Sequence, residues 1–362
     1  MPKVAIVYLS FNSDIYLNDV ISSLEKITYP KDQVELIVVD NPHPVFGSSL
    51  RNLEEKLLPL SGDSIPHVTL LPQAENKGFA GGNNAGISWA IEHDFDYVYF
   101  HNNDGFMAAD CLEKMVLAME HDNHIGVAQS LVLLYPETEL INTAGNNFHY
   151  LGFGYCGNFR KNKNSILAGA VEDVGYASGA SLIMRVSLLK KYGAWDADFF
   201  LYHEDLEYSL RMQAVGYRTV LVRDALFYHK YQFSRNQEKF YFMERNRFAI
   251  MLLYFKLPTL LILLPMAVVM EVGILLFALM HGWLEVKLSV YRYWLNREHW
   301  QLWLKKRSII QTVRTRTDFQ ILKSASDTVI FDEKDINNPL LVYVANPLMQ
   351  VYWFIAKKII LW

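Results

Sequence analysis

The sequence predicts an α/β fold, with a mostly parallel sheet covered by helices on both faces and followed by a C-terminal helical, membrane-associated region. In the first 250 residues, apolar runs typical of buried strands alternate with helical patterns. The charge then changes sign. Residues 1–250 hold 21 basic and 30 acidic side chains (net −9), whereas residues 251–362 hold 13 basic and 8 acidic ones (net +5). Two environments are therefore expected along one chain.

Four apolar runs are predicted as strands, and a helix is expected around residues 86–91. The strands are Val4–Leu9, Val34–Val39, His67–Leu71 and Tyr97–Phe100. Three of them end in polar clusters, namely Ser10–Asp14, Asp40-Asn41 and Asn102–Asp104. Ligands of such sheets bind outside the carboxyl ends of the strands. These clusters therefore predict a binding site at that edge.

Composition excludes several classes of protein. Hydrophobic residues make up 51% of the chain, which is enough to offset the entropy of ordering it. Two cysteines, Cys111 and Cys156, exclude a disulfide-rich scaffold and a four-cysteine zinc site. The net charge of 34 minus 38, or −4, argues against a nucleic-acid partner.

Residues 257–280 form an apolar stretch whose single ionisable member is Glu271. A helix of this length covers about 36 Å, which exceeds a hydrocarbon layer of about 30 Å. Pro265 is expected to kink or break this helix. One crossing would separate the basic tail from residues 1–250, against the positive-inside rule, so a re-entrant or interfacial arrangement is favoured. The alternative is a buried helix pair in a soluble protein.

The remaining residues are basic and aromatic. Six of the eight tryptophans lie between Trp283 and Trp362, as expected at a membrane interface. The predicted organisation is a catalytic domain at 1–250, an apolar membrane-associated segment at 251–285 and an amphipathic helical tail at 286–362.

Three motifs have a chemical interpretation. Asn102-Asn103-Asp104 at a strand end suits a divalent cation that also binds phosphate. The alternative is that these residues cap the following helix. The string Asn76–Gly86 has glycines that permit close backbone approach, and helix-start amides that can meet a nucleotide. Glu204 and Asp205 open a helix, where they either favour its dipole or supply a general base.

The order of these motifs resembles the family-two inverting glycosyltransferases, most closely their rhamnosyltransferase-like members. The resemblance rests on Asp40, Asn-x-Gly-Phe-Ala-Gly-Gly-Asn-Asn, Asn-Asn-Asp, Ser-Gly-Ala and Phe-Phe-Leu-Tyr-x-Glu-Asp, and covers residues 3 to 250. It implies a GT-A fold that binds a nucleotide-diphosphate sugar. Asn102 departs from the family's Asp-x-Asp motif, which weakens the negative charge there.

The resemblance also implies roles for individual residues. Asp205 matches the catalytic base and Glu204 its neighbour, while Asp104 matches the last aspartate of the metal motif. His229 matches a histidine that approaches the metal or the diphosphate, although a packed histidine is the alternative. The expected nucleotide-sugar-binding residues are Ser10, Asn12, Asp40, Asn76, Gly78, Asn83 and Asn103.

The expected cofactor is Mg²⁺ or Mn²⁺, and the expected donor is a UDP- or dTDP-sugar. The acceptor would be a lipid-linked saccharide in surface polysaccharide or cell-wall assembly, at the cytoplasmic face of the membrane. Two alternatives stay open. One is a non-catalytic nucleotide-sugar-binding or assembly protein, and the other is a sugar nucleotidyltransferase.

Overall fold

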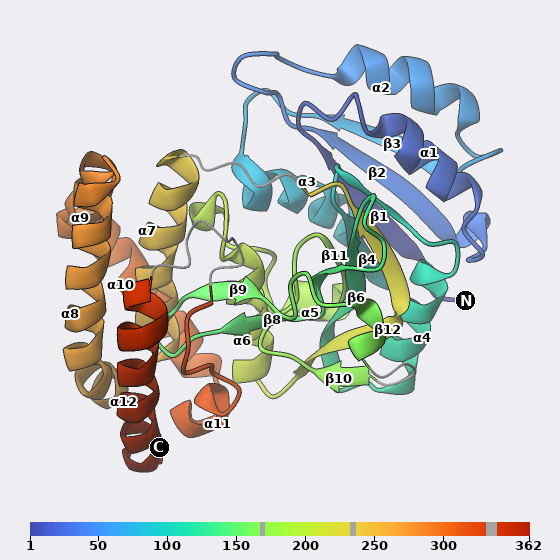
Figure 1. Cartoon of the computed structure of the whole chain (residues 1–362). Coiled ribbons are helices and arrows are strands. Elements are labelled where there is room, and N and C mark those ends of the chain that lie inside the picture. The colour runs from blue at the N-terminus through green and yellow to red at the C-terminus, as the bar shows by residue number, and fades with distance from the viewer. Residues whose placement is uncertain (167–170, 232–236, 331–338) are drawn as a thin grey trace. The chain divides into compact units, whose positions relative to one another are not determined.

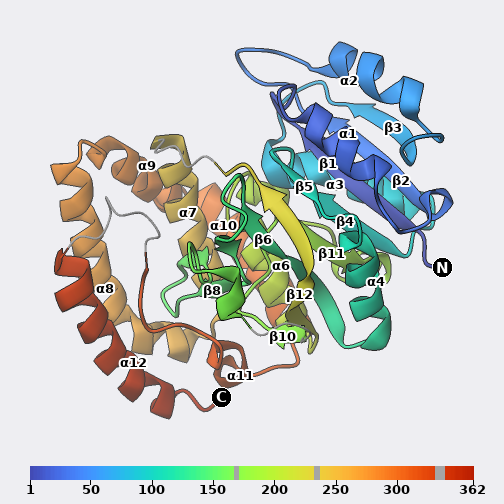
Figure 2. The same ribbon diagram turned by 45° about the vertical axis from the view of Figure 1, so that its right-hand side comes forward.

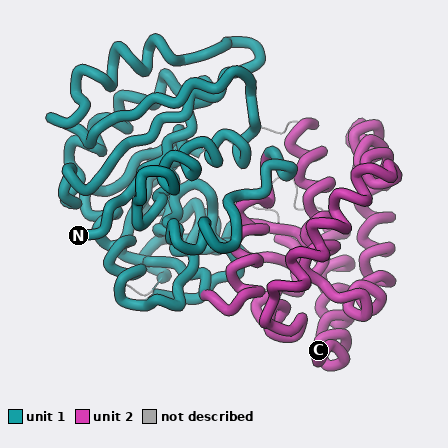
Figure 3. Tube along the Cα trace, turned by 180° about the vertical axis from the view of Figure 1, so that it is seen from behind, with its two compact units in different colours: residues 1–146, 156–200, 218–232 teal, residues 147–155, 201–217, 233–362 magenta. Residues whose placement is uncertain are grey.

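The computed structural model describes residues 1–166, 171–231, 237–330 and 339–362. The chain is divided into two compact units (Figure 3). Unit 1 comprises Met1–Asn146, Cys156–Phe200 and Arg218–Gln232, and unit 2 comprises Asn147–Tyr155, Leu201–Tyr217 and Phe233–Trp362. Residues 201–217, which include Glu204 and Asp205, therefore belong to the same unit as the C-terminal helices.

The strands and helices occur in the following places (Figure 1). The strands are β1 (Val4–Ser10), β2 (Val34–Asp40), β3 (His67–Pro72), β4 (Tyr97–His101), β5 (Gly105–Met107), β6 (Ile125–Leu134), β7 (Ile141–Thr143), β8 (Asn146–Phe148), β9 (Gly154–Cys156), β10 (Val171–Asp173), β11 (Ser181–Arg185) and β12 (Arg218–His229). The helices are α1 (Leu17–Glu25), α2 (Leu50–Leu57), α3 (Gly78–Glu92), α4 (Cys111–His121), α5 (Val186–Tyr192), α6 (Glu204–Ala214), α7 (Gln237–Tyr254), α8 (Leu257–Met280), α9 (Leu284–Leu295), α10 (Arg297–Val313), α11 (Asp318–Leu322) and α12 (Asn346–Ile359).

The main sheet has the strand order β10-β12-β6-β11-β4-β1-β2-β3. The strands β4, β1, β2 and β3 are parallel, as the alternating pattern predicted. The other half is mixed, because β11 pairs antiparallel with both β4 and β6. Antiparallel strands need no helical crossover between them. The alternation of helices and strands in the sequence therefore predicts the parallel half of the sheet but not the mixed half.

Helices cover both faces of the parallel half, as predicted. Alternate residues Val4, Ile6 and Tyr8 of β1 join a core that α1, α2 and α4 complete. Val7 points to the opposite face and meets α3, where a β-carbon on Gly86 would lie 2.6 Å from Val7 Cγ1. This glycine thus allows the helix to pack against the strand.

In unit 2, α7 packs against α9 and α10, while α8 packs against α9 and α12. Figure 2 shows α8 and α12 side by side. The helix α8 continues through Pro265, so the expected break does not occur. Pro265 lies on the exposed face of α8, away from the packed one. By length and composition, α8 is the one helix among the described residues that is able to cross a membrane.

Candidate functional site

The carboxyl ends of β1, β2 and β4 bring the predicted polar clusters to one edge of the sheet in unit 1. The register pairs Ser10 with Asp40, so these strand ends are level. The buried hydroxyl of Ser10 lies 2.8 Å from that of Ser13. Asn103 follows β4, and its side-chain amide donates to the carbonyl of Phe11, 3.3 Å away. Residues distant in sequence are thus hydrogen-bonded at this edge.

Asp40 is buried at the end of β2 and is 2% exposed. Its Oδ1 accepts from the backbone N–H of Ser49 at 3.0 Å, and its Oδ2 accepts from the hydroxyl of Ser48. The carboxylate therefore holds the start of α2 in place. A role in reading the nucleoside stays a prediction.

Asn76 and Gly78 form a fixed turn with Asn41. Asn41 donates to Asn76 Oδ1 at 2.8 Å, and Gly78 N–H donates to the same oxygen at 2.9 Å. Gly78 has a φ of +69°, and a β-carbon there would lie 2.4 Å from the carbonyl oxygen of Phe200. Both the backbone conformation and the close approach therefore require glycine.

The start of α3 differs from the expectation of open amides. The N–H groups of Phe79 and Ala80 donate to the carbonyl of Phe200, at 2.7 and 3.2 Å. Asn83 lies inside this helix, is 2% exposed and donates to the carbonyl of Phe79 at 2.8 Å. Asn12 is exposed in the loop after β1, with a φ of +50°.

Asp104 and His229 are neighbours at the edge of the sheet. His229 Nε2 lies 2.7 Å from Asp104 Oδ1, and the side-chain amide of Asn102 donates to that oxygen at 2.7 Å. Gly105 pairs with His229 across β5 and β12, which sets this proximity. The other ring nitrogen of His229, Nδ1, lies 2.8 Å from Asn142 Oδ1. Because an amide oxygen accepts only, Nδ1 carries a proton.

This arrangement fits a divalent cation. A histidine that ligates a metal commonly donates its other N–H to an oxygen, as His229 does to Asn142. Its Nε2 and the carboxylate of Asp104 then form an adjacent nitrogen and oxygen donor pair. Among the described residues there is no cluster of three or more His, Cys, Asp or Glu side chains suited to a metal. Further ligands would have to be water or phosphate oxygens.

The charge on Asp104 is favoured by its surroundings. Burial raises the pKa of its carboxyl, but His229 lowers it by its charge and hydrogen bond, and the net effect is a lowered pKa. Nearby, burial lowers the pKa of His101 to about 4, so this ring is neutral at pH 7. Asp104 is thus the anionic group expected of a cation ligand.

In unit 2, Glu204 and Asp205 begin α6 as predicted. Glu204 is 4% exposed, and its Oε2 has no hydrogen-bond partner among the residues that the structure describes. Burial, with a further contribution from the charge of Asp205, raises the pKa of Glu204 well above its ordinary value. Asp205 is partly exposed, and its Oδ1 accepts from Leu206 N–H at 2.7 Å. The pair thus combines a buried neutral acid with a more accessible carboxyl group.

The turn before α6 has an uncommon backbone that α7 supports. Tyr202 and His203 have φ values of +65° and +68°. Asn246 of α7 is fully buried and donates to the carbonyls of Leu201 and Tyr202. The ring of His203 lies 3.2 Å from the carbonyl of Gly152. These contacts fix the turn on which the position of Asp205 depends.

Sequence reasoning missed the supporting roles of Asn41, Asn142 and Asn246. Asn41 adjoins the predicted Asp40 and was a visible candidate. Asn142 and Asn246 act on residues 87 and 44 positions away, respectively. A local pattern carries no signal for such contacts.

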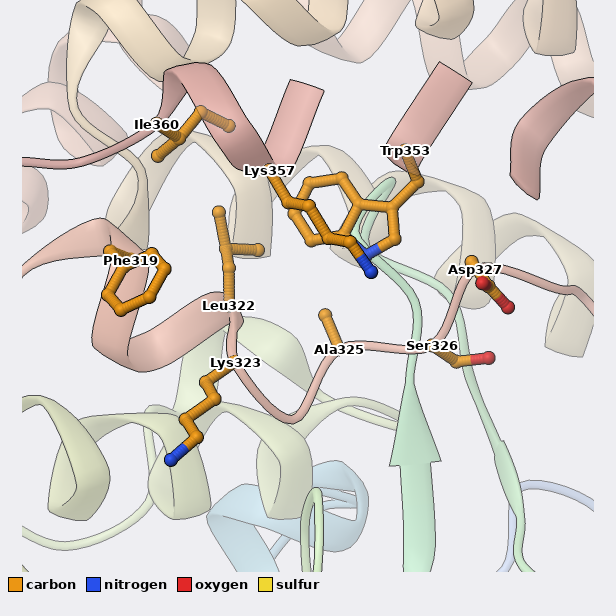
Figure 4. Close-up of a pocket in the computed structure, with 9 residues that line it drawn as sticks. All are labelled: Phe319, Leu322, Lys323, Ala325, Ser326, Asp327, Trp353, Lys357 and Ile360. Carbon is orange, nitrogen blue, oxygen red and sulfur yellow. The ribbon is translucent and has the colours of Figure 1, made fainter. Parts of the chain in front are cut away.

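A cavity of about 350 Å³ lies elsewhere in unit 2, between α11 and α12 (Figure 4). Its lining includes Leu322, Trp353 and Ile360, together with Lys357. None of the predicted site residues lines it.

The architecture is a GT-A fold, as the resemblance predicted. In a comparison with solved structures, 70% of this chain aligns with 50% of the chain in the crystal structure of GalNAc-T7 with UDP, GalNAc and Mn²⁺, with a TM-score of 0.50 and 12% identity. Residues 5–193 match the family model for glycosyl transferase family 2, and the chain belongs to that family.

Two curated relatives are similar to this chain. One is the probable glycosyltransferase YdaM of Bacillus subtilis, 23% identical over 218 residues and covering 60% of this chain. The other is an uncharacterized glycosyltransferase of Haemophilus influenzae, 30% identical over 131 residues and covering 34% of this chain. The matches span about half the length of each relative, 48% in both cases.

Proposed function

We propose that the protein is an inverting, rhamnosyltransferase-like hexosyltransferase. It transfers a sugar from a UDP- or dTDP-sugar to a hydroxyl of a lipid-linked saccharide in surface polysaccharide or cell-wall assembly. The observation that carries the proposal is the Asp104–His229 pair at the carboxyl edge of the sheet of a family-two chain. The solved GalNAc-T7 structure, which contains UDP and Mn²⁺, supports the proposed classes of donor and metal.

Asp104 and His229 would hold Mg²⁺ or Mn²⁺, which when bound would neutralise charge on the diphosphate leaving group. Ser10, Asp40, Asn76, Gly78 and Asn103 lie along the sheet edge or the adjoining turn, and we assign the nucleotide to them. Asn12 and Asn83 complete the proposed set.

Asp205 would act as the general base and Glu204 would support it. The acceptor hydroxyl gives its proton to the Asp205 carboxylate as its oxygen bonds to the anomeric carbon. The bond from that carbon to the diphosphate oxygen breaks at the same time, and the nucleoside diphosphate leaves. A single displacement inverts the anomeric configuration. Because Glu204 is held neutral, it adds little negative charge beside the base.

The proposed acceptor is membrane-bound, which gives the C-terminal helices a purpose. The apolar helix α8 and the net charge of +5 over residues 251–362 support association with an anionic surface. We place the protein at the cytoplasmic face of the membrane.

A screen of UDP-, dTDP- and GDP-sugars by thermal unfolding tests the proposal. The true donor should raise the melting temperature, more strongly with Mn²⁺ or Mg²⁺ present, because ligands that bind the native state stabilise it. Asp104→Asn should remove the metal-dependent part of this shift, whereas Asp63→Asn, at an exposed turn, should leave it unchanged. Absence of a shift with every donor would contradict the proposal.

The products separate this proposal from its alternatives. A glycosyltransferase releases a nucleoside diphosphate in proportion to the sugar transferred. Donor binding without turnover would indicate a binding or assembly protein, and release of pyrophosphate would indicate a nucleotidyltransferase.

A further inference from the structure

The helix α8 has one packed and one exposed face, and the exposed face is wholly apolar. The packed face includes Thr259, Leu263, Met266 and Ala278. The exposed large side chains, which we call the α8 row, are Leu257, Leu261, Leu264, Val268, Val269, Val272, Leu276, Leu279 and Met280. The row extends along the whole helix, which spans 24 residues.

The neighbouring helix α12 also has a packed face and a set of exposed apolar side chains. Its buried side chains include Trp353, which stacks on Tyr150 at 4.7 Å between ring centroids. Its exposed large apolar side chains, the α12 row, are Leu348, Val351, Phe354, Ile355 and Ile359, and Gln350, Lys357 and Lys358 are exposed as well. One hydrogen bond joins the helices, from Tyr352 to the carbonyl of Ile262, and Trp362, which follows α12, donates from Nε1 to Thr259 Oγ1 of α8 at 2.9 Å. The two rows thus belong to one packed pair of helices (Figure 2).

Charged groups fix the packed side of α8. Glu271 pairs with Arg247 of α7 and with Lys287 of α9, at 2.8 Å in the latter case. Glu244 of α7 pairs with the same two cations. Arg247 and Lys287 have 1% and 0% of their side chains exposed. The helices α7 and α9, which supply these charged partners, are therefore tied to α8.

We propose that α8 and α12 lie in the plane of one membrane leaflet, with both rows in the acyl-chain region and without crossing the bilayer. This arrangement would hold the enzyme where a lipid-linked acceptor lies. The biological purpose of the arrangement therefore rests on the proposed function. Binding to lipid, however, requires neither donor nor turnover.

A lipid surface fits these rows better than a second protein does. Protein interfaces surround an apolar centre with polar residues and several hydrogen bonds, whereas the α8 row has no polar member. At the C-terminal end of α12, Lys357 and Lys358 are exposed, and Lys358 Nζ lies 3.8 Å above the Phe354 ring. Lysines beside apolar side chains extend their ammonium groups to lipid phosphates.

The ion cluster argues against a crossing. If α8 spanned the bilayer, Glu271 and its partners on α7 and α9 would enter the hydrocarbon or separate. Charged side chains are unfavourable there, and a buried ion pair that loses one partner is strongly destabilised. A helix in the leaflet plane keeps the cluster on its protein side while its exposed row meets the lipid.

Vesicle flotation of the full chain, without donor, metal or acceptor, tests the surface. Binding is expected with vesicles of about 30% anionic phospholipid and should be weaker with zwitterionic vesicles. Val268→Glu combined with Val272→Glu should lower the partition coefficient about tenfold or more, because two apolar side chains leave the lipid. Leu117→Glu, at an exposed apolar position of α4, is the matched control and should bind as the unsubstituted protein does.

A second pair of substitutions tests the charge contribution independently of the apolar row. Lys357→Gln with Lys358→Gln should remove most of the preference for anionic vesicles and leave thermal unfolding unchanged. This variant keeps the proposal testable if the glutamate variant fails to fold.

Label depth distinguishes an in-plane helix from a spanning one. Single cysteines are introduced at Leu261, Val268 or Leu276 in a Cys156→Ser background, and each is labelled with a fluorophore. Quenching by lipids that carry a quencher at different depths then gives the depth of each fluorophore in the membrane. An in-plane helix gives three similar shallow depths, whereas a spanning helix places Val268 deepest. The spanning pattern, absence of vesicle binding, or a stable dimer that shields the row would each overturn the proposal. Failure of the donor screen would leave these results unaffected.

Discussion

The side-chain amide of Asn246 donates to the carbonyl oxygens of Tyr202 and Leu201, at 2.7 and 3.0 Å. A residue of α7 thereby fixes the turn that starts α6. The turn includes two non-glycine residues with positive φ, a conformation that persists where the surroundings enforce it. Asn246 thus connects the apolar C-terminal helices to the proposed catalytic base.

Replacing Asn246 with Ala should weaken both stability and turnover. Two partly buried carbonyls lose their donor, so the free energy of unfolding should fall by about 1–3 kcal/mol. In the proposed reaction kcat should fall, while the donor's Kd should change little. Urea unfolding and donor titration measure the two effects. Asn164→Ala, at an exposed position, is the control. Unchanged stability would contradict the assigned role.

Replacing Asp205 with Asn should abolish most of the sugar transfer. A positioned general base contributes about 10²–10⁴-fold to rate, so kcat should fall by that range with donor affinity nearly intact. Product formation with an acceptor, alongside thermal shift with the donor, separates the two quantities. The control is Asp198→Asn, at an exposed carboxylate seven positions earlier in the sequence. Retained turnover would refute the role of Asp205.

Glu204→Gln should change how stability depends on pH. The pKa of Glu204 is raised in the folded state, above its unfolded value of 4.5. Above pH 4.5 the unfolded chain loses this proton while the folded protein keeps it. The contribution of Glu204 to the free energy of unfolding is therefore fully present below pH 4.5. Above that pH it declines by about 1.4 kcal/mol per pH unit, until the pH reaches the pKa of Glu204 in the folded protein.

Because glutamine carries no titrating proton, the Glu204→Gln variant does not lose stability in this way as the pH rises. Relative to the unsubstituted protein, its free energy of unfolding should improve progressively as the pH rises above 4.5. Denaturant unfolding at several pH values measures the difference. A difference that does not vary with pH would show that Glu204 is ionised in the folded protein.

Asn142→Ala should weaken metal binding without removing a ligand. Asn142 accepts the Nδ1 proton of His229, which orients the ring and leaves Nε2 toward Asp104. Loss of such a partner typically lowers metal affinity about 10–100-fold. Titration with Mn²⁺, read by the donor-dependent thermal shift, measures this effect. Asn164→Ala should leave the Mn²⁺ affinity unchanged, and equal affinities in both variants would contradict the proposed site.

Lys287→Met should destabilise the C-terminal helices. Burial raises the pKa of Glu244, but Arg247 and Lys287 lower it to about 2, so this buried carboxylate is charged at pH 7. Removing one cation from such a cluster destabilises a protein by about 3–5 kcal/mol. The control is Arg51→Met, in an exposed pair with Glu55, which should change stability by less than about 1 kcal/mol. Thermal unfolding compares them.

The sequence predicted the features that depend on local periodicity. Val4–Leu9 and Tyr97–Phe100 are predicted as strands because they are short apolar runs, and the structure buries every residue in them. The polar residues after them do lie at one sheet edge, since parallel strands end on the same side. The helix opened by Glu204 was also predicted.

The features that the sequence did not predict depend on contacts between residues far apart in the chain. The glycines of α3 serve packing against β1 and Phe200, which depends on where the helix lies. The helix α8 continues through the exposed Pro265, although a proline inside a helix removes one backbone hydrogen bond. Glu271 lies in a sequence that looks wholly apolar, yet its partners come from α7 and α9. Such outcomes follow from tertiary structure, which overrides local preference.

The short pairing of β5 with β12 limits how this chain can change in length. Gly105 faces His229, and a β-carbon at Gly105 would lie 2.2 Å from the ring of Phe227. Inserting one residue between Asp104 and Gly105 would turn the carboxylate to the other side of the ladder, because side chains alternate along a strand. Related chains are therefore expected to vary in length elsewhere and to keep this spacing unchanged.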